Sequence, residues 1–221
     1  MKIIVYYFRT RHRYPVPGTQ YLVTETPIFA PSMKSIAYNQ TFQHVQFTAE
    51  TLEIGEYEAC AFENCDFVNL NLDGVQFTDC EFFKCNLSGA KVNGVAFRDA
   101  RFDDCKLMGV QFTLNNDFLF QAEFENCNLQ LTAFPKMSLK KMKFHHCNLR
   151  EVDFTQAEMP EASFHGCDLL GATFQQTNLE KADFRSAVNY SFDPDQNKVK
   201  KARFSADGLA GLLQKYGIEV S

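Results

Sequence analysis

A large apolar side chain recurs at every fifth position along most of this 221-residue chain. One uninterrupted series runs from Phe42 to Phe112 and a second from Leu119 to Phe184, and all 29 of these central positions are apolar. Because 45% of the residues are hydrophobic, chance would produce this pattern with odds on the order of 10^-10. A repeat of fixed period determines architecture before any other feature.

The period of five matches neither a strand, with a period of two, nor a helix, with a period of 3.6. A chain that turns a corner after every five residues can bury every central residue. Four segments then form one square coil, and successive coils stack as parallel strands about 4.8 Å apart. Residues 20 apart should therefore lie one above another. Phenylalanine recurs at that step: Phe42, Phe62, Phe82 and Phe102, then Phe124, Phe144, Phe164, Phe184 and Phe204.

Glycine occurs two places after a central residue, where a corner can require positive φ. These glycines are Gly74, Gly89, Gly94, Gly109 and Gly171. The pattern therefore predicts corners at regular steps along the coils.

Segments such as Ala122-Glu123-Phe124 and Ala182-Asp183-Phe184 resemble the A-(D/N)-L-x-x tandems of the pentapeptide-repeat family. The resemblance covers roughly residues 38–205. It implies an all-β fold, the right-handed quadrilateral β-helix.

The repeat suggests three regions. Residues 1–37 form an N-terminal extension, irregular or disordered, that either precedes a native start at Met33 or covers the first coil. Residues 38–205 form the β-helix, with two residues inserted at 113–118. Phe118 and Phe120 would then point outward, shielded by the insertion or marking a partner site. Residues 206–221 form a short C-terminal helix that caps the open end.

Apolar residues at helical spacing define that cap, and Gly217 is placed to end its helix. Ser205 or Asp207 can cap the start, and residues 218–220 could add a short strand.

All eight cysteines lie two places before a central residue, in a slot that alanine shares. No Cys-x-x-Cys pair is present, so we expect buried free thiols rather than a zinc site or disulfides. His145, His146 and His165 are expected to be surface histidines. The motifs of nucleophilic and phosphate-binding sites are absent, so no catalytic, metal or cofactor-binding residue is predicted, and the protein is not expected to be an enzyme.

The net charge is −5, which argues against direct nucleic-acid binding. No run of 18 apolar residues is present, so no membrane span is expected. The N-terminal stretch does not fit a signal peptide, which favours a cytoplasmic protein.

Carboxylates gather on the outward positions of the phenylalanine face and of the corner that precedes it. They are interrupted by Lys84, Arg98 and Arg101. They form either an ordinary solvated surface or a stripe that attracts the basic DNA-binding surface of another protein. The candidate acidic surface comprises Glu63, Asp79, Glu81, Asp99, Asp103, Asp104, Glu123 and Glu125.

The C-terminal segment, from Asp193-Pro194-Asp195 to Gly217-Ile218-Glu219-Val220, resembles the ends of topoisomerase-protecting members of the family, the quinolone-resistance (Qnr) group and the microcin-immunity type. In that group the C-terminal element joins two rods into a dimer, and the acidic dimer imitates DNA on DNA gyrase. The resemblance implies a homodimer contact formed by Leu209, Leu212, Leu213, Tyr216 and Ile218. Many Qnr proteins carry two longer loops where this chain has only the two-residue insertion.

Two functions follow from these features. The first is a non-enzymatic DNA mimic that binds a type II topoisomerase, DNA gyrase or topoisomerase IV, and protects it from quinolones or toxins. The alternative is a structural or scaffold module that binds another protein partner, because the five-residue repeat specifies a rod and leaves the partner open.

Overall fold

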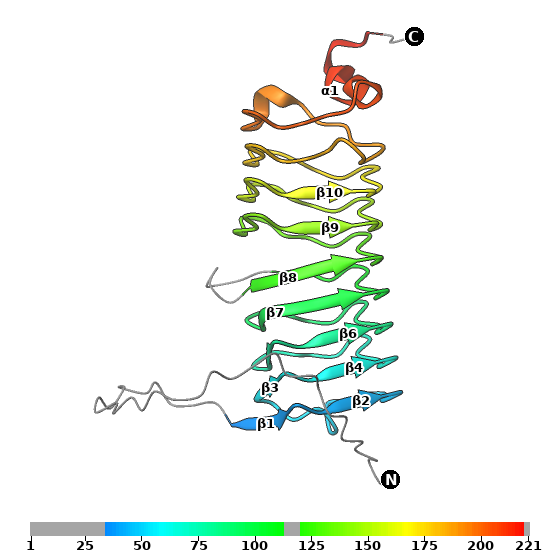
Figure 1. Ribbon diagram of the computed structural model, residues 1–221, viewed down its shortest axis with the longest axis vertical. Helices are drawn as coiled ribbons and strands as arrows, with labels where there is room; N and C mark the ends of the chain where they lie inside the picture. Colours follow the sequence, from blue (N-terminus) through cyan, green and yellow to red (C-terminus); the bar gives the residue numbers. More distant parts are fainter. Residues whose placement is uncertain (1–33, 113–119, 219–221) are drawn as a thin grey trace, which may run out of the picture.

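The structure, a computed structural model, describes residues 34–112 and 120–218; residues 1–33, 113–119 and 219–221 lie outside the described residues. The described chain winds into a stack of coils that rises from the blue N-terminal end to the red C-terminal end (Figure 1). This is the right-handed quadrilateral β-helix predicted from the sequence, and its strands pair in parallel. The predicted N-terminal extension and the two-residue insertion fall on undescribed residues.

Ten short strands form the sheet within the described residues. Their bounds are β1 Ser35–Tyr38, β2 Thr41–Gln43, β3 Glu56–Glu58, β4 Ala61–Glu63, β5 Gln76–Thr78, β6 Glu81–Phe83, β7 Ala96–Asp103, β8 Phe120–Glu125, β9 Lys143–His145 and β10 Ser163–His165. Strands β1, β3 and β5 stack on one face, while β2, β4 and β6 stack on the next. The eight-residue β7 pairs with both β5 and β6, so one strand spans the corner between the two faces.

The register advances from coil to coil at the step that the sequence predicts. Phe62 pairs with Phe82 and Phe82 with Phe102. The next step in this column is two positions longer, from Phe102 to Phe124, after which the original step returns with Phe144. The extra residues therefore leave the phenylalanine column on the same face.

The core is a continuous stack of aromatic rings. The rings of Phe62 and Phe82 lie 4.9 Å apart at 9°, and each also meets a ring of the adjoining face edge-on, as Phe62 meets Phe67 at 5.7 Å. Stacked and edge-on arrangements are both favourable for aromatic pairs. Burial of each large apolar side chain contributes roughly 1.5–3 kcal/mol before entropy is counted, so the stack is the main source of stability.

The corners adopt the left-handed conformation at the position predicted from the glycines. Gly89 has φ of +66° and Gly109 has φ of +70°. Non-glycine residues take the same conformation two places after other central residues, for example Asn64 and Asp79, both with φ of +52°. Asparagine and aspartate tolerate this region better than most residues do, so the corner depends on position more than on glycine.

The inward slot before each central residue binds the preceding coil. The Cys85 thiol donates to the Phe62 carbonyl at 3.1 Å, the Thr177 hydroxyl to the Phe154 carbonyl at 2.8 Å and the Asn197 amide to the Phe174 carbonyl at 2.9 Å. All three bonds have the same sequence separation. A cysteine, a threonine or an asparagine in this slot therefore makes the same hydrogen bond to the preceding coil.

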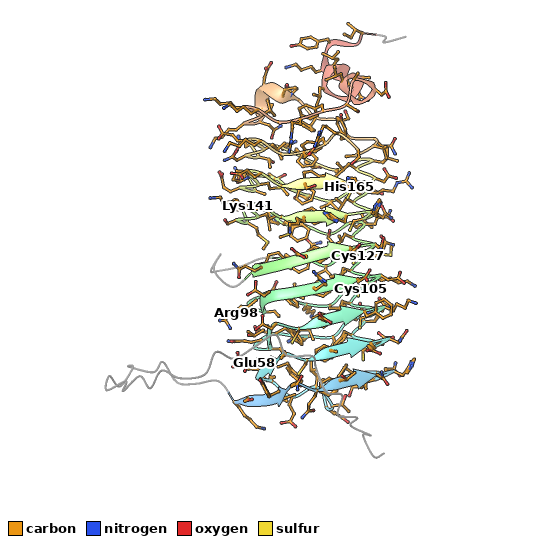
Figure 2. All side chains as sticks on the ribbon, in the orientation of Figure 1. Glu58, Arg98, Cys105, Cys127, Lys141 and His165 are labelled. Atoms are coloured by element: carbon orange, nitrogen blue, oxygen red, sulfur yellow. The ribbon has the colours of Figure 1, made fainter. Side chains whose placement is uncertain are left out.

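The eight cysteines are free and buried, as predicted. Figure 2 shows Cys105 and Cys127 on successive coils. Hydrogen bonds with the thiols of Cys105 and Cys147, together with burial, raise the pKa of the Cys127 thiol. This thiol therefore stays neutral and serves packing.

The predicted outward orientation of Phe120 is wrong, and Phe118 lies outside the described residues. Phe120 is 4% exposed and pairs with Phe97, with a register shift before Ala100 pairs with Ala122. The step from Phe97 to Phe120 is one position longer than the step from Phe102 to Phe124. Phe120 therefore takes the inward place above Phe97, and its ring lies 5.3 Å from that of Phe112.

The C-terminal cap is one continuous helical segment. It consists of a 3₁₀ turn at Asp207–Leu209, helix α1 at Ala210–Leu213 and a second 3₁₀ turn at Gln214–Tyr216. The predicted stop at Gly217 is confirmed, with φ of +61°. The Gly208 amide donates to the Ser205 hydroxyl at 3.2 Å. Ile218 is in no strand, and residues 219–220 lie outside the described residues.

Two glycines allow this segment to lie directly on the last coil. A Cβ atom at Gly208 would lie 1.9 Å from the Tyr190 hydroxyl oxygen, and one at Gly211 would lie 1.9 Å from the Tyr190 carbonyl oxygen. Leu212 packs against the core from this segment. The close approach at the two glycines therefore sets how closely the cap covers the end of the solenoid.

Candidate protein-interaction surface

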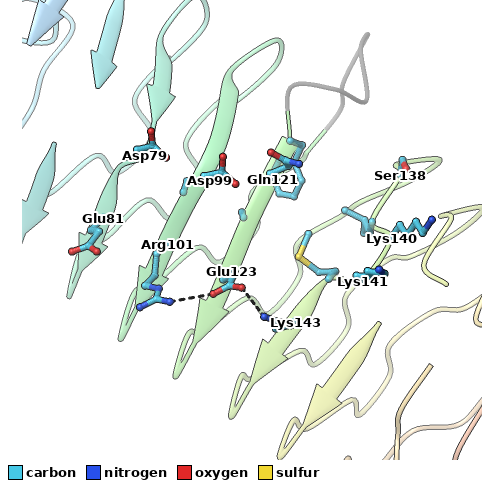
Figure 3. A pocket seen from close by; sticks show the side chains of 15 residues that line it. Asp79, Glu81, Asp99, Arg101, Gln121, Glu123, Ser138, Lys140, Lys141 and Lys143 are labelled. Carbon is cyan, nitrogen blue, oxygen red and sulfur yellow. Dashed lines mark hydrogen bonds and ion pairs between the residues drawn. The ribbon is translucent and has the colours of Figure 1, made fainter. Parts of the chain in front are cut away.

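The predicted acidic residues lie around one face of the solenoid, formed by β4, β6, β7 and β8. Asp79 and Asp99 occupy a corner, and we call the stack Asp79, Asp99, Gln121 and Lys141 the corner column. The outward residues just before each central phenylalanine form the strand column: Glu81, Arg101, Glu123 and Lys143. Figure 3 shows the two columns side by side.

The remaining predicted carboxylates lie across the phenylalanines from the strand column. Glu63, Asp103 and Glu125 follow their central residues on β4, β7 and β8, and Asp104 turns the next corner. We call the stack of Glu63, Phe83, Asp103 and Glu125 the far column. The structure therefore brings all eight predicted residues to one side of the rod, in several columns rather than one stripe.

Charges alternate along the strand column. The Arg101 guanidinium lies 3.3 Å from the Glu123 carboxylate, and the Lys143 ammonium lies 3.0 Å from it (Figure 3). The hydrogen bond from Lys143, with a further contribution from Arg101, lowers the pKa of Glu123. Glu123 is thus a partly neutralised member of the acidic surface.

Other carboxylates on this side differ in how far they are paired. Lys84 lies 3.9 Å from Asp104, and the Asn126 amide donates to Asp103 at 3.2 Å. Within the described part of the chain, Glu63 resembles Asp103 in having no ion pair and in accepting from a neutral amide, that of Gln43 at 2.8 Å. Among the same described residues, neither an ion pair nor a side-chain hydrogen bond is formed by the carboxylates of Asp79, Glu81, Asp99 and Glu125, which therefore carry the least compensated negative charge of the predicted set.

Negative charge is concentrated in the N-terminal half of the solenoid. Residues 34–125 contain 15 acidic and six basic residues, a net of −9, whereas residues 126–221 contain 11 acidic and 12 basic residues, a net of +1. Basic residues gather at Lys140, Lys141 and Lys143. The Lys140-Lys141-Met142-Lys143 segment could have predicted this change of net charge from the sequence, whereas the positions of the acidic residues alone could not.

An open groove of about 580 Å³ lies where the charge changes sign. Asp79, Glu81 and Asp99 line one end, and Lys140 and Lys141 line the other (Figure 3). In neighbouring coils the corner amide bonds to the next coil: Asp79 to the Arg98 carbonyl at 2.8 Å and Lys141 to the Pro160 carbonyl at 2.9 Å. Among the described residues, no corresponding bond joins Gln121 to Lys140, so the wall opens at this corner.

The predicted dimer residues lie on the cap at the C-terminal end. Leu209 is 46%, Tyr216 62% and Ile218 54% exposed, whereas Leu212 and Leu213 are half-buried. With Pro194 and Lys215, four of them line a hollow of about 280 Å³. The Lys215 ammonium pairs with Asp193 and Asp195 beside it. Leu212 therefore helps to hold the cap on the core, while Leu209, Tyr216 and Ile218 form an uncovered apolar surface.

The three histidines lie together on successive coils. The His165 ring lies 5.8 Å from His145 and 5.2 Å from His146, and its Nδ1 is 2.9 Å from the Ser186 hydroxyl. Over residues 34–112 and 120–218, no group of three or more histidine, cysteine or acidic residues is arranged to hold a metal ion. No helix in the same residues is long and apolar enough to cross a bilayer.

Four-sided coils of five-residue segments, with parallel strands and an inward aromatic stack, define this protein as a quadrilateral β-solenoid. The sequence matches the profile described as "pentapeptide repeat region" over residues 55–117 and 113–187, and the chain belongs to the pentapeptide-repeat family.

Solved structures of similar architecture share little sequence with this chain. QnrB1, a plasmid-mediated fluoroquinolone resistance protein, in a trypsin-treated form, is 20% identical with a TM-score of 0.44, over 85% of this chain and 100% of that chain. HetL, involved in heterocyst differentiation regulation in the cyanobacterium Nostoc sp., is 17% identical with a TM-score of 0.32, over 74% and 88% of the two chains. No curated protein sequence matches this chain.

Proposed function

We propose that this protein works without catalysis, as a DNA mimic whose acidic N-terminal half occupies the DNA-binding surface of a type II topoisomerase such as DNA gyrase. The observation that carries the proposal is the net charge of −9 on residues 34–125, which includes the unpaired carboxylates of Asp79, Glu81 and Asp99. The resemblance of the C-terminal segment to topoisomerase-protecting proteins supports the choice of partner.

The density of that charge is similar to that of DNA. At about 4.8 Å per coil, residues 34–125 rise about 22 Å, which gives roughly one net negative charge per 2–3 Å. Duplex DNA carries one charge per about 1.7 Å. A basic groove that binds DNA through its phosphates would therefore meet a comparable field on this half of the rod.

Homodimerisation through the cap would double this surface. Leu209, Tyr216 and Ile218 present exposed apolar area at the end of the rod, which a second copy would cover. In such a dimer the two acidic halves lie at the far ends, with the nearly neutral halves between them. Replacing Tyr216 and Ile218 by glutamate should yield monomers in sedimentation velocity at about 0.5 M sodium chloride, where charge contacts between exposed surfaces are screened; an unchanged mass there would refute the contact.

A gyrase supercoiling assay, with and without a quinolone, tests the function. The protein should change supercoiling at micromolar concentration, and Asp79→Asn/Glu81→Gln/Asp99→Asn should weaken the effect. A matched control neutralises three carboxylates of the other half, Glu151→Gln/Glu158→Gln/Glu180→Gln, and should retain it. No effect of the unmodified protein would refute the proposal.

A scaffold module that binds another protein is the second candidate. The nearly neutral C-terminal half favours it, because a uniformly basic DNA-binding groove would gain nothing there. A pull-down with immobilised protein distinguishes the two: recovery of gyrase or topoisomerase IV subunits supports the DNA mimic, and a different dominant partner supports the scaffold.

A further inference from the structure

The corner column and the strand column carry charges of opposite sign at equal distances on either side of a line between β7 and β8. On the N-terminal side of the line lie Asp79 and Glu81, and at the same distance on the other side lie Lys141 and Lys143 (Figure 3). In the two central rows, Arg101 on β7 stands against Glu123 on β8. Each charge except that of Asp99, whose mirrored position is Gln121, thus has an opposite charge in its own column at the mirrored height.

We propose that a second copy of this chain packs against this surface in the antiparallel direction. A two-fold axis that lies in the contact plane and runs across the rod between β7 and β8 exchanges the two copies, so that each column faces itself with its height inverted. Asp79 then meets Lys141 of the other copy, Glu81 meets Lys143 and Arg101 meets Glu123, and each pair occurs twice. The uncharged Gln121 meets Asp99.

The parallel arrangement does not have this complementarity. A two-fold axis along the rod would place the corner column opposite the strand column at equal height. Asp79 would then meet Glu81, and Lys141 would meet Lys143, so like charges would face each other at both ends. Like-charge contacts of this kind disfavour an arrangement. The charge pattern therefore selects the antiparallel direction.

The groups needed for the contact are accessible. Asp79, Glu81 and Lys141 have no ion pair among the described residues, and the groove beside them offers room for long side chains of a second copy. Glu123, paired with Arg101 and Lys143, would extend the existing ion pairs across the contact. Networks of this kind contribute more than isolated surface pairs.

The charges of the far column determine which part of the face can form the contact. In a flat contact over the whole face, Asp103 would meet Glu125 of the other copy, and two carboxylates would be opposed. The contact is therefore centred on the corner, where the corner and strand columns meet the partner and the far column stays in water. Because Asp79, Glu81 and Asp99 are covered, self-association would compete with any partner that binds the acidic surface.

Sedimentation velocity tests the contact in the Tyr216→Glu/Ile218→Glu background, which removes the proposed cap contact. This background should form a dimer in about 0.05 M sodium chloride and a monomer in about 0.5 M, because salt screens exposed charges. Adding Lys141→Glu/Lys143→Glu should give monomers at both concentrations. Adding Asp79→Lys/Glu81→Lys to that variant should restore the dimer, since both signs are then exchanged.

Lys106→Glu/Lys136→Glu is the matched control, because it changes the net charge equally at exposed positions outside the two columns. It should keep the dimer. A monomer at low salt in the background variant, a charge exchange that does not restore association, or a control that disrupts it equally would each overturn the proposal. These outcomes are independent of the gyrase assay and of the mass change produced by the cap substitutions alone.

Discussion

Replacing Gly211 by alanine should weaken the docking of the C-terminal cap, although alanine normally stabilises a helix relative to glycine by about 1 kcal/mol. The added Cβ would lie 1.9 Å from the Tyr190 carbonyl oxygen and 3.0 Å from its carbon. Both atoms belong to the backbone, so neither can rotate away. The helix must therefore lift by about an ångström from its close-packed contact with the last coil.

The magnitude follows from the contacts that lifting breaks. Half-buried Leu212 would lose about 1 kcal/mol of apolar burial, and the hydrogen bond from Ser191 to Gln214, at 2.6 Å, would lose about 1 kcal/mol. Loss of close packing along the rest of the segment adds to this. After the gain from helix propensity, we expect docking of the cap to weaken by about 1–2 kcal/mol.

Amide hydrogen exchange over residues 208–216 measures this directly, and exchange there should become faster. Gly217→Ala is the matched control. It also adds a methyl group to a glycine, but nothing lies within 4 Å of the new Cβ. The only destabilisation expected from Gly217→Ala is the strain of an alanine in the left-handed conformation. The amides of α1 should therefore keep their protection from hydrogen exchange. Unchanged or slower exchange in Gly211→Ala would refute the packing of the cap on Tyr190.

Three further predictions concern the solenoid itself. Phe144→Ala, in the middle of the aromatic stack with no exposed area, should lower the free energy of unfolding by about 3–5 kcal/mol in urea titrations, while Phe204→Ala, at the half-buried end, should cost about 1–2 kcal/mol; equal losses would contradict a continuous core. Arg185 and Arg203 lower the pKa of Asp183, so its stabilising effect is present above its unfolded pKa and is lost as the pH falls through the folded value. Acid unfolding of Asp183→Asn should lack this component; an unaltered profile below about pH 4 would argue against it. The buried thiols should react with an aromatic disulfide reagent only after unfolding, and rapid reaction of the folded protein would be inconsistent with their burial.

The period of five predicts most of this fold because burial at central positions leaves the backbone few options. It places Phe82 above Phe62, buries Cys85 in its slot and puts a corner at Gly89. It fails at Phe120, because the insertion shifts the register by unequal amounts on adjacent faces, and spacing alone cannot divide such a shift.

The surface was less predictable than the core. The sequence places carboxylates such as Asp79 on the correct side of the rod, since outward positions follow from the repeat. The compensation of Glu123 by Arg101 and Lys143 depends on which charges stack on either side of the insertion, where the step between coils changes. The position of the cap on the last coil was not predictable. From the sequence alone, Gly208 and Gly211 are only weak helix formers, and their close approach to Tyr190 becomes evident only in the structure.

The constant number of segments in each coil also governs how the chain can change in length. Deleting four successive five-residue segments from the solenoid would shorten the rod by one coil and leave every later residue facing the same way. Deleting a single five-residue segment would preserve the buried core but rotate everything beyond it by a quarter turn. Lys141 would then no longer share a corner with Asp79, and the cap would face another direction. Insertions and deletions in this family therefore change the direction in which later surface residues face. A residue-by-residue comparison of sequences does not display this change.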